Sequence, residues 1–501
     1  MKTLLKFLVF LVIIAAILAL VNIEKIKRLQ TVNSLFDADK IVHNFSNMNG
    51  AFLHQTLEAS PEPFIWPSAP APLPKTVTIS GNERDLASLL ETLDTTALVV
   101  IQDGKMLSET YFKGTGRDDR RISWSMAKSF MSGLYGQALE SGQISSLDEN
   151  VESYVPSLKG SAYEGATLRN VLNMASGIRY NEDYLDPKSD INDMGRILGL
   201  GGSMDEYAAG LTQREAVAGE RWKYVSIDTH IAAMVLRAAT GKSLHQLFNE
   251  TYSANLGFEA APYYLTDGEN TAFALGGLNL TTRDYAKFGQ LFLQGGQWRQ
   301  KDGSMKQVIP KDWAAASTRH SAPSMSDRGA GYGYQWWVPM PQEGPNKGDF
   351  FAVGIYGQYI YVNPAKNLVI AKNAADREFT QAIEGYGHSM NVNVDMFRSL
   401  ADHYTPEPIK IGPFHVLTDA QTSDMIARGG YGEGDYGEVF GLARACEGVA
   451  CPSPEEMRAK LNAIAKRAGV TDGAFPTAKE LDQIWNEMRK EHKMQNPVDA
   501  P

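Results

Sequence analysis

Ser125 and Lys128 are the residues of this chain whose types and spacing most directly suggest chemistry. Side chains three residues apart share one face of a helix, so the hydroxyl and the amine would be neighbours. Serine is a weak nucleophile, and lysine can activate it only where burial or nearby positive charge lowers the pKa of the amine. The apolar neighbours Trp124 and Phe130 favour such a setting. The alternative is an N-capping serine followed by a solvated lysine.

A second candidate group, Tyr224-Val225-Ser226, lies about a hundred residues further along and precedes an apolar helical run. A phenol beside an ammonium group can titrate low enough to move protons. We therefore expect Lys128 and Tyr224 to share the proton transfers. The sequence leaves open which of them is the formal base, because coupled groups titrate as a unit.

The third candidate is the glycine-rich entry into an edge strand at Gly354-Ile355-Tyr356-Gly357. Glycine lets a backbone N–H approach a reacting oxygen closely. We expect the N–H groups of Ser125 and Ile355 to form an oxyanion hole beside Gly354. The N–H of Ala352 is the alternative donor if the strand register differs.

Taken in order, Ser-x-x-Lys, Tyr-x-Ser and a glycine-rich strand resemble the penicillin-recognising serine hydrolases, which include DD-peptidases, class C β-lactamases and related esterases and amidases. Further phrases resemble the branch that contains 6-aminohexanoate-dimer hydrolase: Leu172–Gly177, Gly276–Asp284, Gly331–Trp337 and Gly357-Gln358. The resemblance covers residues 76–404. It implies cleavage of an amide or ester through an acyl-enzyme on Ser125, without a metal or organic cofactor.

Two departures from the wider family bear on the substrate. The strand carries no Lys-Thr-Gly or Lys-Ser-Gly triplet, which in the family would bind a β-lactam carboxylate, and Ser226 stands where asparagine is common. Ser226 implies a shorter polar contact to the substrate amide. We therefore expect short linear amides or esters to react better than β-lactams, unless Lys347 or Arg377 replaces the missing cation.

Aromatic residues near the proposed site would offer an apolar wall to an alkyl or acyl chain. They are Tyr180, Tyr184, Trp222 and Tyr356.

The resemblance and the local patterns together predict an α/β (α+β) fold, with an antiparallel sheet flanked by helices beside a helical lobe. A hairpin is expected over 97–112 around an Asp103-Gly104 turn, and a helix is expected from Ser125 towards Leu139. Residues 147–270 are helical and rich in loops. Strand character returns at 334–338, 359–362 and 368–372, and the active site would lie in the cleft between sheet and lobe.

Composition limits the possible partners. The chain has 501 residues, of which 43% are hydrophobic, and a formal net charge of −10. That length allows one large catalytic unit with appendages. Nucleic acid is excluded as the main partner, since phosphate binding needs clustered lysine and arginine. A small-molecule or short-peptide substrate is expected instead.

The N-terminal residues 1–30 predict a membrane anchor, with a signal peptide cleaved on secretion as the alternative. Lys2 and Lys6 precede an apolar run from Phe7 to Val21, and no small-x-small cleavage site follows it. Residues 31–75 contain many prolines between Pro61 and Pro74 and are expected to form an extended spacer.

Residues 405–501 form an extension that the family body does not need. Cys446 and Cys451 suggest a local disulfide, which favours an extracytoplasmic, periplasmic-side location for the catalytic body. Helices are expected near 454–467 and 477–492, where capping-box patterns precede apolar stripes. Their stripes would pack internally, or alternatively bind a partner.

Two functional alternatives remain at this stage. One is a catalytically silent sensor that binds peptide or peptidoglycan on the same fold, and the other is a DD-peptidase or β-lactamase. The presence of Ser125, Lys128 and Tyr224 together argues against a silent binder, because binding alone does not require all three.

Overall fold

The computed structural model describes residues 23–405 except residues 328 and 343. The apolar run Phe7–Val21, both cysteines and the two expected C-terminal helices lie outside the described residues. Within the part that is described, no helix combines the length and the apolar composition needed to cross a bilayer. Residues 23–30 belong to helix α2 (Ile23–Asn33).

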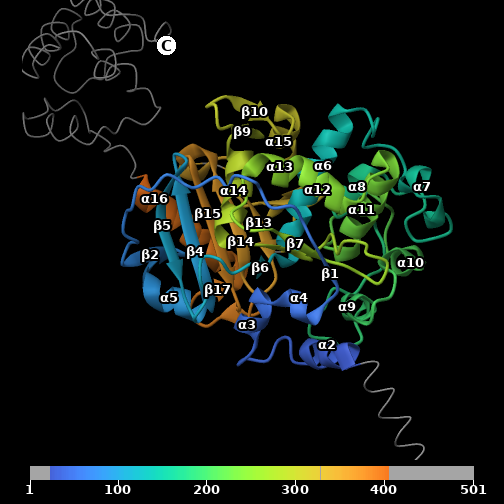
Figure 1. The fold of residues 1–501 in the computed structure, drawn as a ribbon, viewed down its shortest axis with the longest axis horizontal. Helices are drawn as coiled ribbons and strands as arrows, with labels where there is room; N and C mark the ends of the chain where they lie inside the picture. Colours follow the sequence, from blue (N-terminus) through green and yellow to red (C-terminus); the bar gives the residue numbers. More distant parts are fainter. Residues whose placement is uncertain (1–22, 328, 343, 406–501) are drawn as a thin grey trace, which may run out of the picture. The chain divides into compact units, whose positions relative to one another are not determined.

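A seven-stranded antiparallel sheet forms the centre of the described fold (Figure 1). Its strands, in spatial order, are β11 (Gly331–Gly333), β12 (Trp336–Val338), β13 (Phe350–Gly354), β14 (Gln358–Asn363), β15 (Leu368–Ala374), β4 (Thr95–Gln102) and β5 (Lys105–Tyr111). The glycine-rich strand predicted at the edge is therefore an interior strand, because β13 pairs with both β12 and β14.

The expected hairpin is confirmed as β4 and β5. Asp103 and Gly104 connect them with φ values of 50° and 69°, the left-handed conformation that a two-residue turn with the right strand twist requires.

Both faces of the sheet are covered by helices. Alternate residues of β14 point to opposite sides: Tyr361 packs against Phe397 of α16 (Ser389–Tyr404), whereas Ile360 faces α14 (Thr282–Leu293). A Cβ at Gly289 of α14 would lie 2.8 Å from Ile360. The missing side chain thus lets α14 approach the sheet closely.

The remaining helices and strands surround this core, with the helical lobe to the right in Figure 1. The lobe and its connections contain α6 (Ala127–Glu140), α7 (Val151–Tyr154), α8 (Leu168–Leu172), α9 (Asp190–Leu200), α10 (Met204–Ala209), α11 (Ser226–Thr240), α12 (Leu244–Phe248), α13 (Ala254–Leu256) and α15 (Lys311–Ser317). Elsewhere lie α3 (Ile41–Ser46), α4 (Met48–Ala51), α5 (Leu86–Thr92), and strands β2 (Thr76–Ile79), β3 (Asn82–Asp85), β9 (Gln297–Arg299), β10 (Met305–Gln307), β16 (Ala382–Ile383) and β17 (Gly387–His388).

A second, four-stranded sheet leads the chain into the site. Its strands are β1 (His54–Thr56), β7 (Tyr263–Leu265), β8 (Leu278–Leu280) and β6 (Arg121–Ile122). Strand β6 ends only three residues before Ser125, so its pairing with β8 fixes the entry to the predicted nucleophile.

The structure differs from the spacer expected over 31–75. This segment forms α3, α4 and β1, and it buries Phe45 and Trp66 against the enzyme body. Even within the proline-rich stretch, the Ala69 N–H donates a 2.9 Å hydrogen bond to Met106 O. The physical reason is that aromatic and aliphatic side chains stand among the prolines, and they gain more by packing than by remaining in water.

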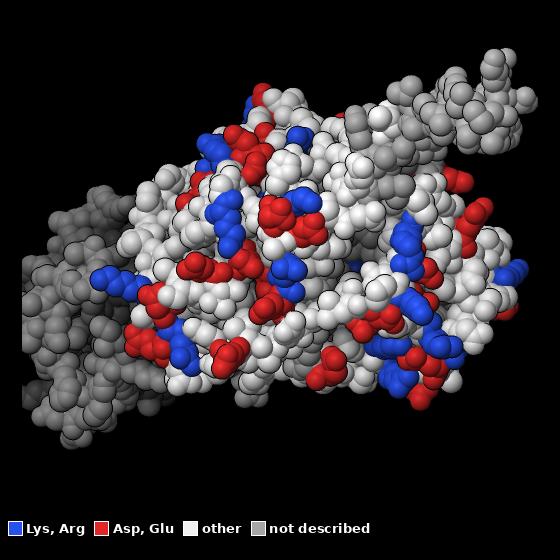
Figure 2. Space-filling model, turned by 90° about the horizontal axis from the view of Figure 1, so that it is seen from below, with Lys and Arg blue, Asp and Glu red and all other residues white. Residues whose placement is uncertain are grey.

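Charged side chains are mixed on the surface. On the face shown in Figure 2, Lys and Arg lie among Asp and Glu over the described part of the chain.

Candidate active site

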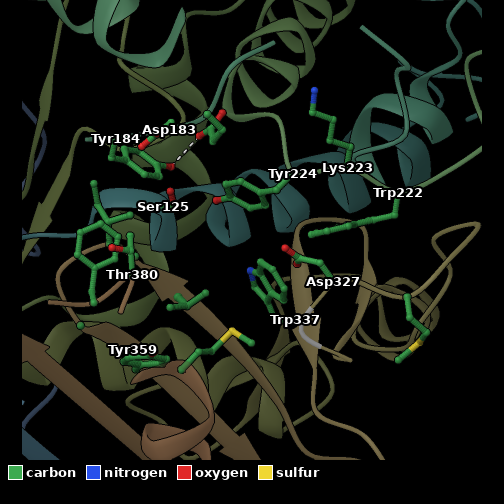
Figure 3. A pocket seen from close by; sticks show the side chains of 18 residues that line it. Ser125, Asp183, Tyr184, Trp222, Lys223, Tyr224, Asp327, Trp337, Tyr359 and Thr380 are labelled. Atoms are coloured by element: carbon green, nitrogen blue, oxygen red, sulfur yellow. Dashed lines mark hydrogen bonds between the residues drawn. The ribbon is translucent and has the colours of Figure 1, made fainter. Parts of the chain in front are cut away.

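Ser125 lies in a short 3₁₀ turn, Trp124–Met126, that leads directly into α6. The side chain is partly buried at the wall of a cavity of about 440 Å³. Figure 3 shows Ser125 among the residues that line this cavity, with the hydroxyl end of Tyr224 pointing toward it. The predicted helix is confirmed, and Ser125 stands at the N-terminal entry to it.

Lys128 is 2% exposed and its ammonium nitrogen reaches three oxygen atoms. These are Ser125 Oγ at 3.0 Å, Ser226 Oγ at 3.2 Å and the backbone oxygen of Leu275 at 3.0 Å. The helical spacing therefore places the amine beside the predicted nucleophile, as the sequence analysis expected.

The number of hydrogen atoms that each group carries decides which partner donates in these hydrogen bonds. The carbonyl of Leu275 can only accept, and the Ser226 hydroxyl donates to the carboxylate of Glu182, so Ser226 accepts from Lys128. A neutral amine has two hydrogens and one lone pair. With both hydrogens used, the lone pair faces Ser125, which is the arrangement a general base requires.

Burial lowers the pKa of Lys128 to about 7, while the charges of Glu182 and Asp228 act in the opposite direction. An ordinary lysine is protonated at neutral pH and cannot accept a proton. Here a substantial fraction is neutral. Burial of the amine, rather than a neighbouring cation, is thus the cause of its lowered pKa.

Tyr224 precedes α11 and lines the same cavity as Ser125. Its ring stacks on Trp337 at a centroid distance of 5.7 Å and lies 5.3 Å from the Lys128 nitrogen. The three residues predicted to carry the chemistry, Ser125, Lys128 and Tyr224, are therefore brought together from the start of α6 and the segment that precedes α11.

The end of β13 lies against the Ser125 turn. A Cβ on Gly354 would lie 2.2 Å from Ser123 O and 3.1 Å from Ser125 N, so only glycine fits. Gly354 and Ile355 line the cavity, whereas Ala352 is buried within the sheet and is not part of the lining. The geometry thus favours the register in which Ile355 rather than Ala352 adjoins Ser125.

Ser226 does not occupy the position that the sequence analysis gave it. Its side chain is 1% exposed and hydrogen-bonds to Lys128 and Glu182 instead of lining the cavity. The reason is its place as the first residue of α11, where it points toward α6.

Sequence reasoning missed Glu182, whose carboxylate accepts from Ser226 N at 2.9 Å and from the Tyr184 hydroxyl at 2.6 Å. Glu182 lies in the loop between α8 and α9, and no regular spacing relates it to Ser125 or Tyr224. An acidic residue between two tyrosines was the only local signal.

Aromatic side chains line part of the cavity, together with the acidic residues Glu182, Asp183 and Asp327. Tyr184 and Trp222 line the cavity as expected, together with Trp337, Tyr359 and Phe379. The other two expected residues do not line it: Tyr180 is buried in the lobe, and Tyr356 stacks on Phe36.

Neither Lys347 nor Arg377 belongs to the cavity lining; Lys223 does. Lys223 pairs with Glu215 at 2.9 Å. Among the residues described here, no group of three or more His, Cys, Asp or Glu side chains is placed to hold a metal ion.

Residues of the sequence motifs that resemble the family form hydrogen bonds around the site. Asn173 accepts from the Tyr334 N–H at 2.8 Å. Gln358 donates to the backbone oxygens of Tyr356 and Ala374 at 2.9 and 2.7 Å, which fixes the turn after Ile355.

Comparison with known proteins agrees with this geometry. Residues 86–381 match the family model described as Beta-lactamase. The chain belongs to this family. It is also similar to the 6-aminohexanoate-dimer hydrolase of Paenarthrobacter ureafaciens, with 29% identity over 320 residues that cover 61% of this chain and 79% of the relative.

A solved structure from Bacillus anthracis, described as a proposed 6-aminohexanoate-dimer hydrolase, has 25% identity and a TM-score of 0.65, covering 75% of this chain and 97% of that one. The predicted superfamily and the mixed α/β fold with antiparallel sheets are confirmed. The chain is a serine hydrolase of the beta-lactamase family that acts on amide or ester bonds.

Proposed function

We propose that this enzyme hydrolyses short linear amides or esters through an acyl-enzyme on Ser125. The observation that carries the proposal is the Lys128 amine, which is buried, has a lowered pKa and lies 3.0 Å from Ser125 Oγ. A base positioned in this way is what a serine nucleophile needs near neutral pH.

In the acylation step, Ser125 Oγ attacks the substrate carbonyl carbon while its proton moves to the Lys128 amine. The developing oxyanion accepts hydrogen bonds from the N–H groups of Ser125 and Ile355. Each such donor is worth on the order of 10²–10³ in rate. Tyr224 and Lys128 then pass a proton to the leaving nitrogen or oxygen as the carbonyl–leaving-group bond breaks. Water releases the acyl group by the reverse sequence.

The cavity supports a linear, partly apolar substrate. Its walls present the rings of Trp222, Trp337 and Tyr359, which would cover an alkyl or acyl chain. Lys223, its lining lysine, already pairs with Glu215, so a β-lactam carboxylate would have to compete for it. A site that leaves a substrate carboxylate unpaired discriminates strongly against it.

The test compares kcat/KM for three substrates: a p-nitrophenyl ester, an aminohexanoate-type amide and a chromogenic cephalosporin. We expect the ester or the amide to react well and the cephalosporin to react poorly or to acylate slowly. Equal or faster turnover of the cephalosporin would contradict the proposed substrate class and favour the β-lactamase alternative. No turnover of any acyl substrate would favour the silent sensor.

We further propose that the N-terminal run Phe7–Val21 tethers the enzyme to a membrane, with the catalytic body on the extracytoplasmic side. The support is the sequence alone: the apolar run after Lys2 and Lys6, and the Cys446/Cys451 pair. Retention in the membrane fraction after an alkaline wash is expected. A mature N-terminus near Asn22 would instead show cleavage and secretion.

A further inference from the structure

Two bulky residues with left-handed backbone conformation flank the proposed oxyanion hole. Trp124, with φ of 43°, immediately precedes Ser125, and Tyr356, with φ of 61°, immediately follows Ile355. This conformation is strongly disfavoured for large side chains, and it persists only where the surroundings hold it. The backbone at Trp124 directs the peptide that carries the Ser125 N–H. The backbone at Tyr356 begins the turn that closes β13 onto β14 beside Ile355.

Two phenylalanines from the N-terminal segment hold the rings of both residues. Phe45 lies edge-on to Trp124 at a centroid distance of 5.6 Å and to Tyr356 at 5.3 Å. Phe36 stacks on Tyr356 at 4.9 Å with an interplanar angle of 15° and lies 6.1 Å from Trp124. The Trp124 indole nitrogen is buried without a hydrogen-bond partner among the described residues, so packing positions this ring.

Hydrogen bonds fix Phe36 and Phe45 relative to β6, the strand that leads to Ser125. Arg121 of β6 is 1% exposed and donates to Val42 O at 2.8 Å and to Ser46 Oγ at 2.5 Å, which ties α3 to the strand that enters the Ser125 turn. The Asn44 side chain donates to Ser34 O at 3.2 Å and to Leu35 O at 3.1 Å. Asn44 therefore ties the loop that carries Phe36 to α3.

We propose that residues 34–46 are a positioning element of the active site, in which Phe36 and Phe45 hold Trp124 and Tyr356 in the conformations that aim the oxyanion donors. This segment precedes the region that matches the family model, residues 86–381. The inference rests on the proposed function, because it assigns the two N–H groups to the oxyanion.

We expect loss of the Phe36 contacts to weaken binding of the transition state. If the aromatic contacts are lost, the two N–H groups lose alignment with the oxyanion, whose negative charge is absent in the bound substrate and develops in the transition state. Turnover should fall by about 10- to 100-fold, less than removal of a donor, with KM changed by less than about twofold. The rate at which a serine-directed phosphonate labels Ser125 should fall in parallel.

The test uses Phe36→Ala in the full-length protein, because Phe36 is 39% exposed and its loss leaves no large buried cavity. Phe64→Ala is the matched control. Phe64 belongs to the same N-terminal region but packs on Trp66 and Trp298, at 5.2 Å from each. If Phe36→Ala melts below the assay temperature, Phe36→Leu replaces it, since leucine keeps most of the apolar volume and loses the flat stacking surface.

A lower kcat and slower labelling for the Phe36 variant, with KM and the Phe64→Ala control close to wild type, would support the proposal. Wild-type turnover in the Phe36 variant would overturn it, as would an equal loss in Phe64→Ala or a change confined to KM. If the wild-type protein neither turns over an acyl substrate nor labels at Ser125, the proposed function itself fails, and this inference fails with it.

Discussion

Lys128 and Glu182 share one hydrogen-bond partner, the hydroxyl of Ser226. Because that hydroxyl donates its single hydrogen to the carboxylate, it presents a lone pair to the lysine. This relationship aims the lysine lone pair at Ser125, and it also connects the amine to the negative charge of Glu182, which is half-buried at the cavity wall. The position and the pKa of the Lys128 amine therefore depend on a residue for which no contact with Ser125 is seen among the described hydrogen bonds.

The first prediction concerns the pH dependence of kcat/KM. In the proposed mechanism the neutral form of Lys128 accepts the Ser125 proton, and burial lowers the pKa of this lysine to about 7. Activity should therefore rise as the pH increases through about 7 and then reach a plateau. Glu182 raises this pKa, so Glu182→Gln should move the rising limb to lower pH while keeping an acceptor for the Ser226 N–H.

The control for this prediction is Glu83→Gln, which removes the same charge from an exposed position on β3. It should leave the profile unchanged. If the rising limb of the kcat/KM profile does not move in Glu182→Gln, or moves to higher pH, then Glu182 does not raise the pKa of Lys128.

The second prediction concerns Tyr224→Phe. The variant keeps the ring that stacks on Trp337 and removes only the hydroxyl. Turnover should fall by about 10²–10⁴, the usual contribution of a general acid or base, with little change in KM. Steady-state kinetics and a thermal melt check it. A variant that melts lower but retains turnover would identify Tyr224 as a merely structural tyrosine.

The third prediction concerns Gly354→Ala. The new Cβ would lie 2.2 Å from Ser123 O, a backbone atom that cannot move without displacing the Ser125 turn. Turnover should fall by about 10² or more, and overpacking should cost about 1–3 kcal/mol of stability. Gly195→Ala in α9 is the matched control, because nothing lies within 4 Å of a Cβ there. Normal turnover in Gly354→Ala would show that β13 does not end against the nucleophile.

Sequence reasoning predicted most successfully where the signal was local. The Asp103-Gly104 hairpin and the helix after Ser125 each depend on a few consecutive residues, and both formed as expected. The proximity of Ser125, Lys128 and Tyr224 could be predicted because the motifs that contain them occur in the same order as in the family that the chain resembles. Their catalytic roles stay predictions.

What sequence reasoning missed depends on contacts between distant segments. Glu182 reaches Ser226 across 44 residues, and Phe36 reaches Tyr356 across an even longer separation. Neither pair has a characteristic spacing. The spacer was expected because prolines dominate its local composition, and the structure shows instead that its buried aromatic residues decide where it lies. Ser226 was given a substrate contact by analogy, whereas the start of α11 points it inward.

The most direct test of the account is mass spectrometry of the protein after reaction with a serine-directed phosphonate. The wild-type protein should gain one adduct on Ser125. Lys128→Ala should suppress this labelling without unfolding the protein. Ser129→Ala is a matched control from the same helix, since Ser129 donates to Gln335 O instead of facing the cavity, and it should label normally. Labelling of Ser125→Ala to the same extent as wild type, or an adduct on another serine, would contradict Ser125 as the nucleophile.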